Sequence, residues 1–339
     1  MSGPAGIKDV AAHAGVSVGT VSNVLNRPHL VRPETRERVE TAMADLGFVR
    51  NESARQLRAG SSRIVAFVFT DTSNPFFADV ARGAEEACRE SDLALVMCNS
   101  DGDPAREEDY LSLLLEQRVH GVMIATSDAG GTRLRSLPGL GIPVVLVDSG
   151  ESSTSVWCSV GVNDAAGGEL AVAHLIERGH RRIAFIGGPA GVPQLRDRLT
   201  GVHRALESAD LPPDRLTTIE TPATTVGAGR DGGRHLLGLP ASTRPTAVFC
   251  GNDLVALGLL QELTRHGARV PDDVAIVGYD DIDFAASAAV PLTSVRQPRY
   301  LLGRTAARLL LRESEARGHH RHEYVRFEPE LVVRQSSGG

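Results

Sequence analysis

The chain has 339 residues, of which 42% are hydrophobic and 23% charged, and it contains a single lysine, Lys8. This length is typical of two or three folded units, and the composition is typical of a globular protein. A single lysine excludes a P-loop, which needs a lysine at the phosphates of a nucleotide. It also argues strongly against an enzyme that works through a lysine Schiff base.

The charge is unevenly distributed along the chain. The net charge is −6, but the first 60 residues hold eight basic against six acidic residues and therefore carry +2. A weakly basic head on an acidic body fits local contact with phosphates. No apolar run reaches membrane-spanning length, no secretion signal opens the chain, and the four cysteines are scattered. We therefore expect a cytoplasmic protein that does not enter membranes.

Residues 7–26, IKDVAAHAGVSVGTVSNVLN, have the pattern of two short helices joined by a turn. Gly15 suits the left-handed turn, and Ser17 is placed to cap the second helix. Val21 and Val24 would be buried, which leaves a small, polar face exposed. This pattern predicts a DNA-binding helix-turn-helix, with an ordinary helical hairpin as the alternative.

A third helix is predicted from about Pro33 to Gly47, and residues 51–62, NESARQLRAGSS, follow it. These residues read either as a linker or as a short helix. Leu57 between Arg55 and Arg58 is unusual for a solvated linker, and apolar side chains flanked by arginine are used to kink the DNA minor groove. The pattern alone leaves both interpretations open.

From Ile64 onward the chain alternates between strands and helices. Continuous apolar strands predict parallel sheets covered on both faces, and two successive doubly wound units predict two lobes with a cleft. The predicted strands are 64–70, 93–99, 121–125, 143–148, 183–188, 216–220, 247–251, 274–280, 324–327 and 331–334. The predicted helices are 76–91, 105–118, 164–178, 196–209, 230–238, 253–266 and 299–313.

With these elements in place, the chain resembles transcription factors of the lac repressor family (LacI/GalR type) over nearly its whole length. The resemblance rests on the order and spacing of AGVSVGTVSNVLN, TRERVETAMADLGFVRNESARQL, HLIERGHRRIAFIGGP, RPTAVFCGNDLVALG, VAIVGYDDID and PLTSVRQP. It implies an α plus α/β fold: a three-helix head (residues 1–50), a hinge helix (51–62) and a two-lobed core of periplasmic-binding-protein type (63–339). The expected N-lobe is about 63–162 plus 291–323, and the expected C-lobe about 163–290 plus 324–339.

The resemblance assigns DNA contacts to the second helix and the hinge. Leu57 matches the hinge leucine that inserts into the minor groove, and Val18 and Gly19 are smaller than the family usually has, so Asn23 and the hinge would carry much of the base reading. Two heads in a homodimer imply a palindromic operator in double-stranded DNA, with a tetramer as the alternative assembly. The expected DNA-binding residues are Ser17, Val18, Gly19, Thr20, Ser22, Asn23, Asn26, Ala54, Arg55 and Leu57.

The resemblance also places a small effector in the cleft, a sugar first and a purine as the alternative. An aromatic platform with an amide suits a sugar ring, and carboxylates with an arginine can bind vicinal hydroxyls. Phe77 could equally belong to the core, and the charged residues could instead pair across the cleft. The expected effector-binding residues are Asn74, Phe76, Phe77, Asp148, Gln194, Arg198, Asn252 and Asp280.

Other sites are not expected. Gly227-x-Gly229-x-x-Gly232 matches a dinucleotide fingerprint but does not directly follow an apolar strand. His319, His320 and His322 are interpreted as a charged surface turn, because no further metal ligand has suitable spacing, so neither metal nor cofactor is expected. No catalytic motif is present. The sequence thus predicts an effector-controlled transcriptional repressor, and a transport protein for solutes, the rival class, would lack the head.

Overall fold

The structure, a computed structural model, describes residues 5–48, 62–126, 132–149, 156–316 and 320–338. The chain separates into two units, Met1–Ser62 and Arg63–Gly339. Among the described residues, no helix is long and apolar enough to cross a lipid bilayer. The hinge prediction for residues 51–61 lies outside the described residues.

The first unit is built from three helices around a small apolar core. The helices are α1 (Ile7–His13), α2 (Val18–Asn26) and α3 (Pro33–Asp45), with the 3₁₀ turn η1 (Pro28–Leu30) between the last two. Val10, Val21 and Val39 are completely buried where the three helices meet. Gly15 adopts φ +62°, as the predicted turn requires.

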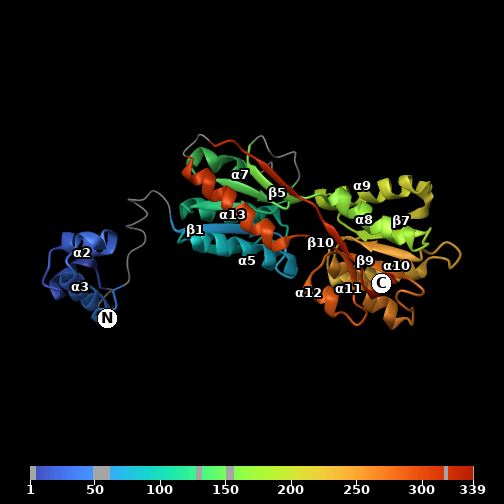
Figure 1. The fold of residues 1–339 in the computed structure, drawn as a ribbon, viewed down its shortest axis with the longest axis horizontal. Helices are drawn as coiled ribbons and strands as arrows, with labels where there is room; N and C mark the ends of the chain where they lie inside the picture. The colour runs from blue at the N-terminus through green and yellow to red at the C-terminus, as the bar shows by residue number, and fades with distance from the viewer. Residues whose placement is uncertain (1–4, 49–61, 127–131, 150–155, 317–319, 339) are drawn as a thin grey trace. The chain divides into compact units, whose positions relative to one another are not determined.

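The second unit contains two six-stranded sheets, each with helices on both faces (Figure 1). The first sheet has the strand order β11-β5-β4-β3-β1-β2, and all its paired strands are parallel. Apolar side chains fill both faces, with α5 and α13 packed on each other over one of them. Its elements are β1 (Ile64–Phe69), α5 (Pro75–Glu90), β2 (Ala94–Asn99), α6 (Pro104–Glu116), β3 (Gly121–Ile124), α7 (Thr132–Ser136), η2 (Pro138–Leu140), β4 (Val144–Val147), β5 (Cys158–Val162), α13 (Arg299–Glu315) and β11 (Tyr324–Phe327).

The second sheet has the order β12-β10-β9-β8-β6-β7, in which only the β10–β12 pair is antiparallel among the described strands. The helix pairs α8–α9 and α10–α11 pack closely. Its elements are α8 (Asp164–Glu177), β6 (Ile183–Gly187), α9 (Pro193–Ser208), η4 (Pro213–Arg215), β7 (Leu216–Glu220), α10 (Val226–Gly238), β8 (Ala247–Cys250), α11 (Asp253–Arg265), β9 (Ala275–Asp280), α12 (Asp283–Ser287), β10 (Thr293–Arg296), β12 (Glu330–Val332) and η5 (Gln335–Ser337).

The predicted lobe boundaries near residues 291 and 324 are wrong. Strand β10 pairs with β9 and β12, so it belongs to the second lobe, whereas β11 pairs with β5 in the first lobe. The chain therefore crosses after β10 and again after β11. Strands β5 and β10 were not predicted, because both are short and contain few large apolar residues, although most of their side chains are buried.

The glycine motif at 227–232 lies within α10, so it is not a phosphate loop. A Cβ at Gly229 would come within 2.2 Å of the Val255 carbonyl oxygen. Gly229 therefore allows close packing of α10 against α11, and Gly232 allows close packing of α10 against Ile186 of β6.

Candidate functional site

The second helix of the head presents the predicted small, polar face. Ser17 caps α2, and its Oγ accepts a hydrogen bond from the Thr20 amide at 3.1 Å. Val18 is 42% exposed, and Gly19 and Asn23 are also exposed. The Asn23 side chain therefore has room to meet an external partner, while Val21 and Val24 face the core.

The two hydroxyls on this face already have partners within the helix. Thr20 Oγ1 lies 2.9 Å from Ser17 Oγ, and the Asn26 side chain donates to the Ser22 carbonyl at 2.8 Å. Asn26 also donates to Ser22 Oγ at 3.3 Å. The predicted contacts Ala54, Arg55 and Leu57 lie outside the described residues.

A cavity of about 520 Å³ opens where strands of the two lobes end. Parallel strands gather their carboxyl ends at one edge of a sheet, and such edges hold the ligands of doubly wound folds. All eight predicted effector-binding residues line this single cavity: Asn74, Phe76, Phe77, Asp148, Gln194, Arg198, Asn252 and Asp280.

The first lobe contributes an aromatic wall at the start of α5. Asn74 caps this helix, since its Oδ1 accepts from the Phe76 amide at 3.0 Å. The rings of Phe76 and Phe77 pack edge to face at 5.1 Å, and Phe77 continues into a cluster with Phe67 and Phe69. With exposures of only 3% and 8%, Phe76 and Phe77 are core residues that also line the cavity. The two interpretations of Phe77 are thus not exclusive.

Arg198 is the buried cation of the cavity, at 5% exposure. Its Nε donates to Asp164 at 2.8 Å and its Nη1 to the Gly251 carbonyl at 2.6 Å. The guanidinium carbon also lies 3.6 Å from the centre of the Tyr279 ring. Burial opposes the charge, but Asp164, Tyr279 and other acidic groups outweigh it and raise the pKa of Arg198 above its usual range.

Asp148 follows β4 with φ +55° and faces Gln194 from the other lobe. The Gln194 side chain donates to the Asp148 backbone carbonyl and to its Oδ2, the latter at 3.3 Å. The other carboxylate oxygen of Asp148, Oδ1, is enclosed and has no hydrogen-bond partner among the described residues. Burial, reinforced by Asp164 and opposed by Arg198, raises the pKa of Asp148 to about 7.

Asp280 is the corresponding buried carboxylate of the second lobe, and it contacts an amide side chain of the first lobe. It is 4% exposed, accepts from Gln297 at 2.7 Å and receives a longer bond of 3.4 Å from Asn74 across the cleft. Burial raises the pKa of Asp280 although Arg198 and the two amides favour its charged form. Its φ of +101° is unusual for a residue with a side chain, and such strain is concentrated at ligand sites.

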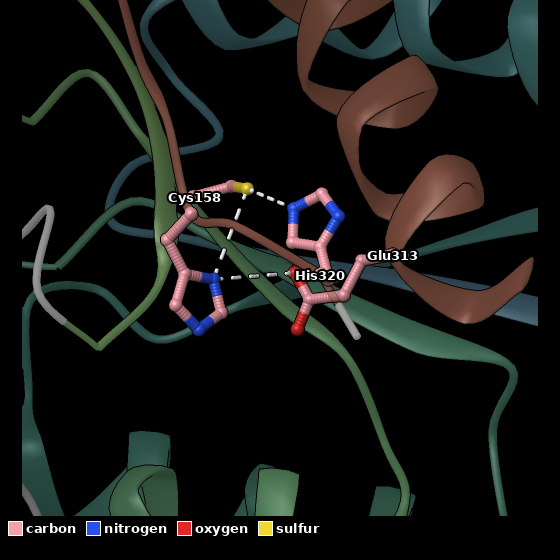
Figure 2. A group of neighbouring side chains, drawn as sticks. Cys158, Glu313 and His320 are labelled. Carbon is pink, nitrogen blue, oxygen red and sulfur yellow. Dashed lines mark hydrogen bonds and ion pairs between the residues drawn. The ribbon is translucent and has the colours of Figure 1, made fainter. Parts of the chain in front are cut away.

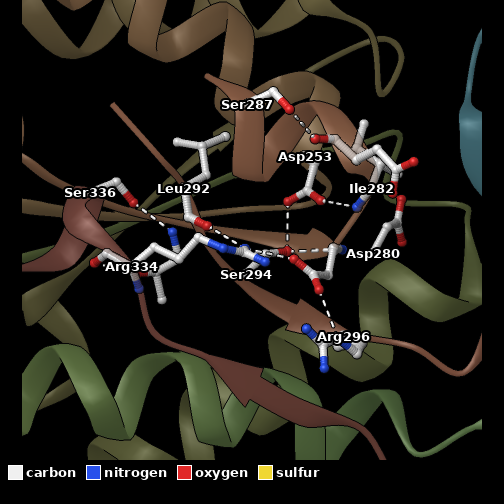
Figure 3. A network of polar contacts seen from close by, with 12 residues as sticks. Asp253, Asp280, Ile282, Ser287, Leu292, Ser294, Arg296, Arg334 and Ser336 are labelled. Carbon is white, nitrogen blue, oxygen red and sulfur yellow. Dashed lines mark hydrogen bonds and ion pairs between the residues drawn. The ribbon is translucent and has the colours of Figure 1, made fainter. Parts of the chain in front are cut away.

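A network of buried polar groups holds the Asp280 loop from behind (Figure 3). Asp253 is completely buried and accepts from the Ile282 amide at 2.9 Å and from Ser294 Oγ at 2.7 Å. Ser294 in turn accepts from the Asp281 amide at 3.0 Å. These bonds fix the backbone that turns Asp280 into the cavity.

Asp281 turns away from the cavity and pairs with two arginines of the network. Its carboxylate lies 2.7 Å from Arg296 and 2.6 Å from Arg334. Burial opposes its charge, but hydrogen bonds from these two arginines lower its pKa. The pKa values of the adjacent residues Asp280 and Asp281 are therefore shifted in opposite directions.

Asn252 lines the cavity but is committed to local structure. Its Oδ1 caps α11 by accepting from the Val255 amide at 3.0 Å, and its Nδ2 donates to the Thr224 carbonyl at 3.1 Å. Two further residues, Asp164 and Gln297, hold Arg198 and Asp280 in place and were not predicted from the sequence. Asp164 could have been found, because it follows a strand end, but β5 itself had been missed.

Two known protein families match this chain, one over the head and one over the core. The family "Bacterial regulatory proteins, lacI family" matches residues 6–51, and the "Periplasmic binding protein-like domain" matches residues 172–337. The HTH-type transcriptional repressor PurR of Aliivibrio fischeri (strain MJ11) is 36% identical over 331 residues, which is 97% of each chain.

Two solved structures extend the similarity to three dimensions. The lac repressor dimer bound to operator and the anti-inducer ONPF has a TM-score of 0.85 at 27% identity, with 99% of each chain covered. The complex of the transcriptional regulator CelR with cellobiose has a TM-score of 0.73 at 32% identity, covering 98% of this chain and 99% of that chain. Both similarities span the head and the two lobes together.

Proposed function

The chain belongs to the lacI family of bacterial regulatory proteins, and we propose that it represses transcription from a palindromic operator under the control of a neutral sugar. It is a DNA-binding transcriptional repressor of this family, not an enzyme. The proposal adds the dimer on the operator, the chemical class of the effector and the residues that contact each partner.

The exposed face of α2 supports the assignment of the base-reading residues. Asn23 is exposed, and an asparagine can form two hydrogen bonds to an adenine edge in the major groove. Val18 offers a methyl contact to thymine, while Gly19 only leaves space. Ser17, Thr20, Ser22 and Asn26 are assigned to phosphate contacts and to the geometry of the helix.

Because the exposed face of α2 has few groups that can read bases, we propose that the hinge contributes to operator binding. We assign Leu57 to the central step of the minor groove, with Ala54 and Arg55 beside it. Leu57→Ala should lower operator affinity and DNA bending. Leu113→Ala, at a half-exposed position on α6, is the matched control. If bending is unchanged in Leu57→Ala, the wedge assignment is wrong.

The observation that carries the sugar proposal is the charge of the cavity lining. Four carboxylates line it against one guanidinium among the described residues. Arg198 is already paired with Asp164, and one of the carboxylates, Asp101, is paired with Arg106. An anionic ligand would meet net repulsion, whereas sugar hydroxyls would donate to the carboxylates. The enclosed Oδ1 of Asp148 and the aromatic wall at Phe76 suit a polar edge and an apolar ring face.

A purine is the second candidate, because the chain is also similar to repressors named PurR. The cavity favours it less, since both aromatic residues in the described lining, Phe76 and Phe77, come from one lobe. A purine ring held on both faces would need a second aromatic side chain from the opposite lobe. The volume of about 520 Å³ fits either ligand.

We propose a two-state mechanism for control. A ligand that satisfies Asp148 and Asp280 together binds one arrangement of the lobes more tightly than the other. It can shift the equilibrium only by that difference in affinity. In the dimer this shift would change the spacing of the N-lobes, and that change would stabilise or melt the hinge helices.

The decisive experiment is operator selection from random DNA, repeated with neutral sugars, their phosphorylated forms and purine bases. A palindromic site whose occupancy changes with a neutral sugar is the expected result. A response only to a purine or to an anionic ligand would overturn the sugar assignment. Asp280→Asn should lose the ligand response and keep operator binding, while loss of both would indicate misfolding.

A further inference from the structure

Four potential metal ligands converge at the end of the first lobe that lies away from the effector cavity. They are Cys158 at the start of β5, Glu313 in the last turn of α13, and His320 and His322 in the segment before β11. Figure 2 shows the side chains of Cys158, Glu313 and His320 turned toward one another. None of the four residues lines the effector cavity.

We propose that these four side chains form a site for one zinc ion. One donor atom from each residue lies within 4.8 Å of all the others. Cys158 Sγ is 2.9 Å from His320 Nε2 and 3.9 Å from His322 Nδ1, and His322 Nδ1 is 3.9 Å from Glu313 Oε2. Donors of a tetrahedral zinc site are about 3.3–3.7 Å apart, so small side-chain movements suffice.

The donor set selects for zinc among the common cations. Thiolate and imidazole are ligands for borderline and soft metals, whereas magnesium and calcium require oxygen ligands. Four protein ligands would complete a tetrahedral shell, as in structural zinc sites, so that no position remains open for water. The site would fasten the α13–β11 connection onto β5.

Burial gives a second, independent reason for a cation. Glu313 is 12% exposed, and its Oε2 has no hydrogen-bond partner among the described residues. A buried carboxylate oxygen without a hydrogen bond is costly unless a cation neutralises it.

The sequence alone does not reveal this group of side chains. The histidines of RGHHRHEY were interpreted as a surface turn because no further ligand had suitable spacing. The missing ligands are Glu313, on the preceding helix, and Cys158, which comes more than 150 residues earlier. Parallel pairing of β11 with β5 brings them together. His319 lies outside the described residues and has no part in the proposal.

The test uses the full-length, tag-free protein after chelator treatment. Zinc titration against a chromophoric chelator should give one ion per chain. Cobalt substitution should give intense visible bands of a tetrahedral ion and a thiolate charge-transfer band. Glu313→Gln and His322→Ala should each weaken zinc binding at least tenfold, and Cys158→Ser should remove the thiolate band.

A double variant, His203→Ala with His235→Ala, is the matched control, because both histidines are exposed and lie outside the cluster. It should bind zinc as the unsubstituted chain does. Cys158 is fully buried, and its substitution could impair folding, so Glu313→Gln and His322→Ala decide the outcome. Unchanged zinc affinity in both, or a cobalt spectrum without a thiolate band, would overturn the proposal.

Discussion

Asp148→Asn tests whether the effector cavity destabilises the ligand-free protein. Burial and neighbouring carboxylates raise the pKa of Asp148 from 3.8 to about 7. The carboxyl group therefore holds its proton more tightly in the folded chain than in the unfolded chain. Its contribution to stability is present at low pH and is lost as the pH rises from about 4 to about 7.

The magnitude follows from this shift. Each pKa unit corresponds to ~1.4 kcal/mol, so the full shift would cost about 4 kcal/mol above pH 7. About 2–3 kcal/mol of this cost would arise between pH 5 and pH 8. Asparagine cannot ionise, so the melting temperature of Asp148→Asn relative to the unsubstituted chain should rise by about 4–6 °C across that interval, at ~2 °C per kcal/mol.

The assay is thermal unfolding of both proteins at matched ionic strength from pH 5 to pH 8, without ligand. Asp273→Asn is the control, because hydrogen bonds from Arg269 lower the pKa of Asp273 to about 2. The stabilising effect of Asp273 is present above pH 4 and is lost only as the pH falls toward 2, so its difference from the unsubstituted chain should stay constant between pH 5 and 8. A constant difference for Asp148→Asn as well would refute the reasoning.

The remaining predictions concern packing and caps. Arg198→Met should destabilise the chain by about 3–5 kcal/mol in urea unfolding, because it leaves Asp164 buried without its cation; a loss below ~1 kcal/mol would contradict this. Gly303→Ala should cost about 2–3 kcal/mol, since its Cβ would lie 1.8 Å from a backbone oxygen of α5, whereas Gly238→Ala meets no atom within 4 Å and should be nearly neutral. Ser17→Ala should cost about 1 kcal/mol in the head, measured as faster hydrogen exchange of the α2 amides; unchanged exchange would exclude the cap.

Local sequence patterns predicted much of this fold. The continuous apolar run after Ile64 indicated a strand buried on both faces, and β1 is buried along almost its whole length. Ser17 was expected to cap α2, and its hydroxyl does so. The eight candidate effector residues, which the resemblance to the lac repressor family implied, line one cavity, in agreement with the rule that ligands of doubly wound folds bind at the strand ends.

The missed features depend on contacts between distant parts of the chain. The strand β5, CSVGV, has too few large apolar residues to be recognised, although neighbouring strands bury it on both sides. The exchange of β10 and β11 between lobes follows from the pairing partners available at each sheet edge. Asp253 appears in the sequence as an ordinary first-turn acid of a helix, and only the fold brings Ser294 and Ile282 to it.

The geometry of the cavity links its instability to its proposed control. Asp148 carries an enclosed oxygen without a partner, and Asp280 is held at φ +101°. Each contacts an amide of the opposite lobe, Gln194 and Asn74 respectively, and the Asn74–Asp280 bond is long at 3.4 Å. A ligand whose hydroxyls meet both carboxylates would relieve these costs on both lobes at once. Since those costs depend on how the lobes meet, the ligand would bind one lobe arrangement more tightly than another, which is the differential affinity that regulation requires.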